Sequence, residues 1–138
     1  MSEQDAPPAL HAYLSYRDAA AALEWLTATG FEITTRQDGP SSTLTHAELR
    51  YGEAVVMIAS ADADRAAAPL RGSSTGSGLY LWMSTTEAVD QWYERAVAAG
   101  AREVLPPQDT EWGSRRARVL DPEGYEWSAG TYRPGQSW

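Results

Sequence analysis

The sequence lacks several features that would assign it to particular functional classes. It contains no cysteine, which excludes disulfide bonds, thiolate metal ligands and a cysteine nucleophile. No stretch approaches the roughly 20 consecutive apolar residues that a membrane-spanning helix needs, and residues 1–8 do not resemble a secretory signal. We therefore expect a cytoplasmic protein that does not interact with membranes.

Lysine is also absent, and the charge is one-sided. The 11 basic side chains, all of them arginine, stand against 19 acidic ones and give a formal net charge of −8. This balance argues against nucleic acid as the main partner, because phosphate groups need a basic surface. It is compatible with a cationic or zwitterionic ligand, although an acidic surface more often serves solubility.

The length of 138 residues and the hydrophobic content of 43% suit one domain, or two small halves that share a core. Residues 61–77 combine an Asp/Ala run with the Gly/Ser-rich stretch RGSSTGSG, which is typical of a linker. They separate two modules, at about residues 9–60 and 78–132.

Each module is expected to contain a strand, a helix and three further strands. In the first, alternation predicts strands at residues 9–16, 31–36, 44–50 and 54–60. Asp18 is the expected N-cap of a helix that runs to about Thr29 and is ended by Gly30. The last strand, AVVMIAS, is apolar on both faces, so we expect it to lie between the core and an apolar cavity.

The second module follows the same order. A strand at residues 78–84 precedes a helix that Thr86 is expected to cap and Gly100 to end. A short strand at 102–105 is predicted to stop at Pro106, and a hairpin at 110–132 follows. The hairpin turns at Asp121-Pro122-Glu123-Gly124, where proline presets φ and glycine eases the exit.

The two modules repeat one pattern. The helix-ending glycines Gly30 and Gly100 are 70 residues apart, and the same offset superposes His46 on Arg116. We therefore predict an α+β fold of two βαβββ modules, whose mixed sheets curl around a shared cup with the helices outside. Strand alternation predicts the following residues on the cup face: His11, Tyr13, Ser15, His46, Glu48, Arg50, Val56, Ile58, Tyr80, Trp82, Arg116, Glu126 and Ser128.

Four stretches carry a resemblance to a known family. They are LSYRDAAAALEW (14–25), HAELRYGEAVVMI (46–58), RAVAAGA (95–101) and the residues from Trp112 through the DPEG turn to Tyr132. In this order they resemble the vicinal-oxygen-chelate superfamily, which contains the glyoxalase and bleomycin-resistance proteins. The resemblance covers nearly the whole chain.

Enzymes of that superfamily bind a divalent metal with a His or Gln on the first strand and a Glu on the last strand of each module. The matching positions here are His11, Ile58, Gly78 and Ser128. Three of these four supply no anionic oxygen, so the resemblance implies that the family's metal is absent. A different zinc set of His11, His46 and Glu48 stays open, as does a simple hydrogen-bonded His46–Glu48 pair.

The resemblance leaves two functions open. Resistance proteins of the family bind an antibiotic without changing it, as dimers and without metal, and this chain resembles them in its lost ligands and its aromatic cup. Trp82 and Trp112 are expected to stack on a flat or cationic ligand, unless they only fill the cup. The alternative is a lyase, isomerase or cyclase that uses His46, Glu48 and Arg50.

We thus predict a homodimeric binding protein for an aromatic or cationic small molecule, with no cofactor. The predicted ligand-binding residues are His11, Tyr13, His46, Glu48, Arg50, Tyr80, Trp82, Trp112, Arg116 and Ser128.

Overall fold

The computed structural model describes residues 9–61 and 76–135. The first module contains β1 (Ala12–Tyr16), α1 (Ala19–Thr29), β2 (Glu32–Asp38), β3 (Leu44–Tyr51) and β4 (Ala54–Ser60). The second contains β5 (Gly78–Trp82), α2 (Thr86–Ala98), β6 (Arg102–Asp109), β7 (Arg115–Leu120) and β8 (Glu126–Gly130). The predicted α+β fold of two βαβββ modules is confirmed, while most of the predicted linker lies outside the described residues.

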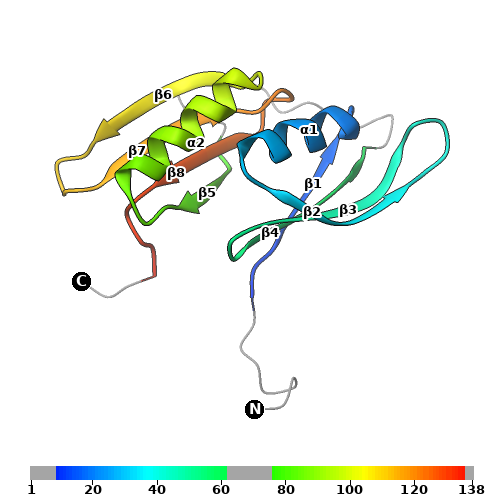
Figure 1. The fold of residues 1–138 in the computed structure, drawn as a ribbon, viewed down its shortest axis with the longest axis horizontal. Coiled ribbons are helices and arrows are strands. Elements are labelled where there is room, and N and C mark those ends of the chain that lie inside the picture. The colour runs from blue at the N-terminus through cyan, green and yellow to red at the C-terminus, as the bar shows by residue number, and fades with distance from the viewer. Residues whose placement is uncertain (1–8, 62–75, 136–138) are drawn as a thin grey trace, which may run out of the picture.

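Each module forms its own four-stranded mixed sheet, in the orders β1-β4-β3-β2 and β5-β8-β7-β6. The pairs β1–β4 and β5–β8 are parallel and the other pairs are antiparallel. Figure 1 shows the two helices next to each other, each lying against its own sheet. We call the sheet face turned away from the helices the cup face. No helix among the described residues is long and apolar enough to cross a membrane.

Local capping sets the helix ends. The Asp18 side chain accepts a hydrogen bond from the Ala21 backbone N–H, and Gly30 ends α1 with a φ of 129° that glycine adopts without strain. The prediction that Thr86 caps α2 is wrong by one residue. Thr85 is the cap, because its hydroxyl is the one that reaches the Ala88 backbone N–H.

The expected stop at Pro106 is also wrong, since β6 continues through both prolines to Asp109. β6 is the outer strand of its sheet, where a missing N–H leaves no partner unpaired. Its register against β7 shifts between Leu105 and Gln108, so the prolines lie in a bulge.

The prediction that Val56 and Ile58 lie on the cup face is wrong. They pair with Leu49 and Ala47 on β3 and are buried in the core with them. The paired residues Leu49 and Val56 are seven positions apart, whereas the equivalent pair Val119 and Trp127 is eight positions apart, so the repeat offset changes. It is 70 between Leu49 and Val119 but 71 between their partners Val56 and Trp127.

One buried cluster contains apolar residues of both modules. Its centre is aromatic: the Trp127 ring lies 5.8 Å from Trp25 and 5.9 Å from Phe31, between ring centroids. The Trp25 indole also donates to the Ala96 carbonyl in α2, at 3.1 Å. Aromatic contacts of this kind add to the apolar burial that holds the modules together.

Asp121, the first residue of the β7–β8 turn, is buried and accepts four hydrogen bonds. One oxygen takes the Tyr16 hydroxyl at 2.6 Å and the Trp127 indole at 3.1 Å. The other takes the backbone N–H groups of Glu123 and Tyr125, at 3.0 Å each. Because Tyr16 ends β1, this carboxylate links the second module to the first.

The same turn reaches the first module twice more. The Glu123 carboxylate accepts the backbone N–H groups of Arg17 and Asp18, both at 2.7 Å. The Tyr125 hydroxyl donates to the Ser15 carbonyl at 2.7 Å. Side-chain contacts between residues far apart in the sequence therefore hold the end of β1 against the β7–β8 turn.

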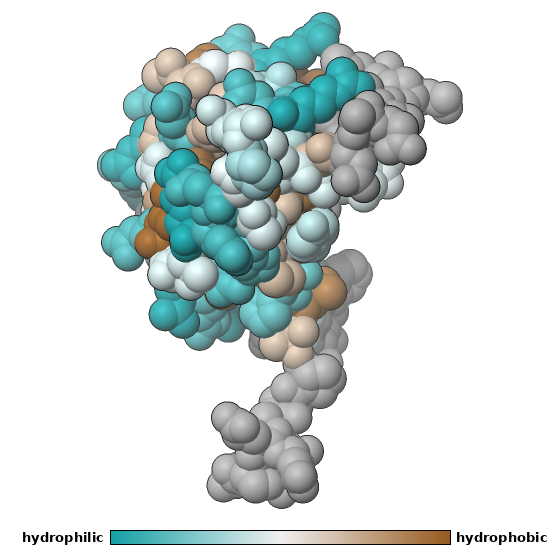
Figure 2. Space-filling view, turned by 90° about the vertical axis from the view of Figure 1, so that its right-hand side faces the viewer, coloured by the Kyte–Doolittle hydropathy of each residue, from teal (hydrophilic) through white to brown (hydrophobic). Residues whose placement is uncertain are grey.

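The opposite border of the molecule is polar. All seven residues of β2 are exposed, and the side of the molecule that includes β2 and β3 shows mostly hydrophilic residues (Figure 2). Among the described residues of β2, Ile33 is the one large hydrophobic side chain, with 38% exposed, and a single exposed side chain of this kind does not form a hydrophobic binding surface.

The hydrogen bond between Tyr16 and Asp121 predicts that the loss of one hydroxyl group lowers the stability of the protein. Tyr16→Phe removes one donor to a buried carboxylate, which costs roughly 1–3 kcal/mol of the free energy of unfolding. Urea unfolding followed by fluorescence measures this loss. Tyr13→Phe is the control, since Tyr13 is exposed, and an equal effect of both variants would contradict the link.

Asp121 also predicts a pH dependence of stability. Burial raises its pKa above the usual aspartate value, against the lowering effect of its hydrogen bonds. The folded chain thus holds this proton more tightly than the unfolded chain. The stability that Asp121 contributes is present below its unfolded pKa and falls as the pH rises through the folded pKa.

This dependence is measured as the difference in free energy of unfolding between the wild type and Asp121→Asn, over the acidic range. The other carboxyl groups are common to both proteins and cancel in the difference. The advantage of the wild type should shrink as the pH rises; a growing advantage would show that the folded pKa is lowered.

Candidate functional site

On the cup face of the first sheet, His46 and Glu48 form a pair. Their side chains project from β3 on the same side, and His46 Nε2 lies 2.7 Å from Glu48 Oε2. Glu48 pairs with Met57 on β4, which pairs with Tyr13 on β1. The register therefore brings the predicted residues Tyr13, His46 and Glu48 to one face.

His11 does not join this pair. It is exposed and precedes the first residue of β1. The register puts His46 level with Ser15, and the four residues from Ser15 back to His11 span roughly 13 Å along a strand. Arg50 is exposed at the far end of β3, one residue before Tyr51. In the part of the chain that the structure describes, no three His, Asp or Glu side chains group to hold a metal.

On the cup face of the second sheet, Arg118 is the central group. Its Nε donates to the Ser128 hydroxyl at 3.0 Å and lies 3.6 Å from Glu126 Oε2. Glu126 is buried, with 8% of its side chain exposed. A buried carboxylate needs a cationic partner of this kind, because an unpaired charge is costly to bury.

The positions implied for the family's metal do not fit one. A Cβ built at Gly78 would lie 2.7 Å from Glu126 Oε2, so this glycine leaves room for the Glu126 carboxylate instead of offering a ligand. In the first module, Met57 and not Ile58 faces the cup, and a thioether is a poor ligand for a hard cation. The fourth position, Ser128, is bonded to Arg118.

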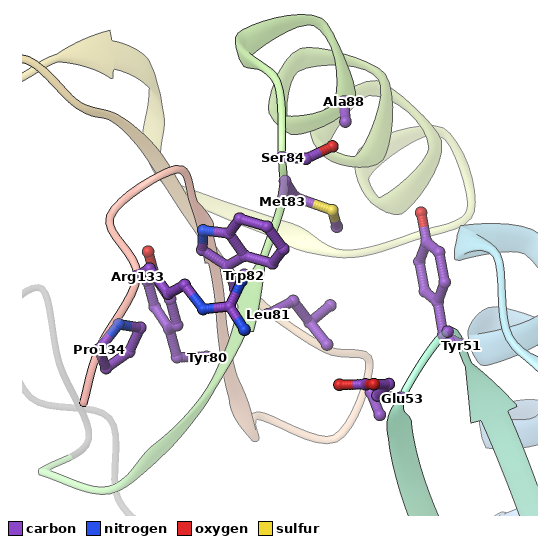
Figure 3. A pocket seen from close by; sticks show the side chains of 12 residues that line it. Tyr51, Glu53, Tyr80, Leu81, Trp82, Met83, Ser84, Ala88, Arg133 and Pro134 are labelled. Carbon is purple, nitrogen blue, oxygen red and sulfur yellow. The ribbon is translucent and has the colours of Figure 1, made fainter. Parts of the chain in front are cut away.

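A cleft of about 690 Å³ opens between the two modules. Figure 3 shows Tyr51 and Glu53 of the first module on one side, and Trp82, Tyr80 and Arg133 of the second on the other. The remaining lining residues are Gly52, Ala54, Leu81, Met83, Ser84, Ala88 and Pro134. Its volume is in the range of small-molecule sites.

Two of the three aromatic rings that line the cleft, Tyr80 and Trp82, are held by the chain that follows β8. The Tyr80 hydroxyl donates to the Tyr132 carbonyl at 2.6 Å, and the Trp82 indole donates to the Thr131 carbonyl at 3.1 Å. Both rings are about two-fifths exposed, at 41% and 42%. Partial burial raises the pKa of Tyr80, which keeps its hydroxyl protonated as a donor. Large rings that are fixed yet exposed are suited to stacking.

Two neighbouring residues, Gly130 and Arg133, affect the Tyr80 and Trp82 rings. A Cβ built on Gly130 would lie 2.5 Å from the Tyr80 hydroxyl, so only glycine lets the Tyr80 ring take its place. The Arg133 guanidinium lies 4.6 Å from the centroid of the Trp82 ring, a cation–π contact.

The other predicted residues lie apart from the cleft. Trp112 is 66% exposed in the loop between β6 and β7, which Figure 1 shows at the end of the molecule away from the first module. Arg116 is exposed on the cup face of β7, where it pairs with Gly130, and Gly130 pairs with Trp82 on β5. Neither Trp112 nor Arg116 lines the cleft.

Sequence reasoning missed Arg118 as a site residue, although Arg118 alternates with the apolar residues Ala117 and Val119, a pattern that indicates the polar face of β7. It also missed Tyr51, Glu53 and Arg133. These three lie at a turn and in the C-terminal segment, where no periodic pattern indicates a direction. Only the packing of one module against the other brings them together.

Comparison with known proteins gives the same fold. Residues 9–129 match the model of the Glyoxalase/Bleomycin resistance protein/Dioxygenase superfamily. An uncharacterised protein of Mycobacterium bovis is 32% identical over 127 residues, which are 89% of this chain and 82% of that protein. An uncharacterised protein of Mycobacterium tuberculosis (strain H37Rv) has the same identity and covers 89% of this chain and 74% of its own length.

Solved structures agree. TioX from Micromonospora sp. ML1 is 29% identical with a TM-score of 0.68, covering 94% of this chain and all of its own. A bleomycin-binding protein in complex with bleomycin is 16% identical with a TM-score of 0.61, covering 92% of this chain and all of its own, and shares the fold. The chain therefore belongs to the glyoxalase/bleomycin resistance protein/dioxygenase superfamily.

Proposed function

We propose that this chain binds an aromatic or cationic small molecule without chemically changing it, and does so without a metal. The observation that carries the proposal is the cleft between the modules, with the exposed and hydrogen-bonded rings of Tyr80 and Trp82 on its wall. The net charge of −8 favours a cationic ligand. A protein of this fold binds bleomycin, which makes an antibiotic one candidate ligand.

The Arg118–Glu126 pair supports the absence of metal in this function. In the second sheet a guanidinium group neutralises the buried carboxylate, and it also bonds to Ser128, at the position where the family's enzymes carry an acidic ligand. A second cation there would meet like charge. We further propose a cytoplasmic homodimer, in which the partner covers exposed rings of the cup face such as Tyr13, 59% of which is exposed.

An enzyme of the lyase, isomerase or cyclase type is the second candidate. The contact of 2.7 Å between His46 and Glu48 favours it, because a carboxylate that holds a histidine in one tautomer is a common acid/base arrangement. Arg50, on the same strand, was predicted to take part in this chemistry.

The metal-free proposal predicts that divalent cations do not stabilise the protein. A metal that binds the folded state alone raises the melting temperature, by an amount that grows with the logarithm of its concentration relative to its Kd. Thermal unfolding in millimolar Zn²⁺ or Mn²⁺ should give the same midpoint as in EDTA. A clear rise, or stoichiometric metal in the purified protein, would argue for the enzyme.

The binding proposal predicts quenching of tryptophan fluorescence by planar ligands. Bleomycin and a panel of planar aromatic amines serve as ligands, and the residues to test are Trp82 and Trp112. The double variant Trp82→Ala/Trp112→Ala should lose the quenching, because it removes the indole of the cleft wall, Trp82, together with the exposed Trp112, which lies outside the cleft and which the sequence predicted to bind the ligand. Each single variant separates the two positions, and quenching that survives in the double variant would contradict their role.

A further inference from the structure

The cleft between the modules has walls of opposite charge. Glu53 projects from the turn between β3 and β4 on one side, and Arg133 lies over Trp82 on the other (Figure 3). Both side chains are exposed. Among the described residues, neither forms an ion pair with a partner of opposite charge.

The stacking of Arg133 prepares it to bind an anion. A guanidinium that rests on an indole face uses its flat surface for the cation–π contact and keeps the N–H donors at its edge. Those donors match the two oxygens of a carboxylate. The hydrogen bond from the Trp82 indole to the Thr131 carbonyl fixes the ring beneath. The guanidinium of Arg133 therefore stacks on a ring with a defined position.

The first turn of α2 also lies at the cleft. Ser84 and Ala88 line the cleft, and Thr85 between them caps the helix. The partial positive charge of this helix end is offset by the carboxylate of Glu87 in the same turn, so Arg133 is the group that would bind an anion here. Glu53, across the cleft, supplies the negative charge that an ammonium group requires.

The surface between the charged walls is largely apolar. Leu81 and Met83 form its base, Ala54 and Ala88 border it, and the ring of Tyr51 stands beside it. Such a surface accepts an uncharged hydrocarbon or aromatic body and offers it few hydrogen bonds.

We propose that this cleft recognises a zwitterionic molecule of the amino-acid type, with its carboxylate on Arg133, its ammonium on Glu53 and its apolar or aromatic side chain on the apolar lining of the cleft. This inference rests on the proposed binding function and specifies its ligand class. A purely cationic ligand would leave Arg133 as a repulsive neighbour, and a purely anionic one would face Glu53.

Three probes with the same ring test the inference: phenylalanine, phenethylamine and 3-phenylpropanoate. They carry both charges, the ammonium alone and the carboxylate alone. Isothermal titration calorimetry on the full chain should show that phenylalanine binds about two- to fivefold more tightly than either of the others, as exposed charge pairs predict.

Two variants assign the charges. Arg133→Gln should abolish the preference for phenylalanine over phenethylamine, and Glu53→Gln the preference over 3-phenylpropanoate. Arg36→Gln is the matched control, since Arg36 is exposed on β2 and pairs with Asp38 away from the cleft, and it should change neither preference.

The possible failures are distinguishable. Equal affinities for all three probes, or preferences that persist in Arg133→Gln and Glu53→Gln, would overturn the zwitterion assignment while leaving a binding cleft. The absence of binding heat for every probe would count against the assignment and against the proposed function together.

Discussion

The structure depends on the buried carboxylate of Asp121. It binds two side chains, Tyr16 of the first module and Trp127 of the second, and it also binds the backbone of its own turn. Four donors around one carboxylate offset part of the cost of removing it from water, and the raised pKa of Asp121 reflects the part that they do not offset. The bond to Tyr16 fixes the end of β1 relative to the β7–β8 turn, so the relative position of the two modules follows from it.

That relative position creates the candidate site. The cleft is formed by the β3–β4 turn of one module and by β5 and the C-terminal segment of the other, so neither module forms it alone. The aromatic centre of Trp25, Phe31 and Trp127 holds the two modules together by apolar contact. The hydrogen bonds of Asp121 fix the orientation of one module relative to the other. Binding and stability are therefore linked in this chain: a change that loosens the module contact also changes the shape of the cleft.

The chemistry of the site differs from that of the family's metal enzymes in a definite way. Arginine side chains are prominent at the site, and Arg118 lies beside Ser128, the position at which the family's enzymes carry an acidic metal ligand. Arg118 neutralises Glu126 and bonds to Ser128 in the second sheet, and Arg133 lies on Trp82 at the cleft. A guanidinium binds and orients an anionic group, but it does not supply the open coordination position of a metal. These contacts favour recognition over metal-assisted catalysis.

The sequence predicted the structure well in the segments where apolar and polar residues recur at a regular spacing. The order of elements, the end of α1 at Gly30 and the cup face of the second sheet follow from alternation and capping, and all are confirmed. Val56 and Ile58 were assigned to the wrong face because β4 is apolar on both sides and offers no alternation. Tyr51, Glu53 and Arg133 escaped prediction because their proximity depends on packing between modules. The DPEG turn was recognised for its local geometry, whereas the role of Asp121 depends on Tyr16, which is 105 residues away in the chain.

The most direct test of the account is a titration with phenylalanine followed by the indole N–H resonances of the six tryptophans. We predict that the Trp82 resonance shifts with ligand concentration, while those of the buried Trp25, Trp92 and Trp127 stay in place. A Trp82 resonance that does not move as phenylalanine is added would contradict a binding site between the modules.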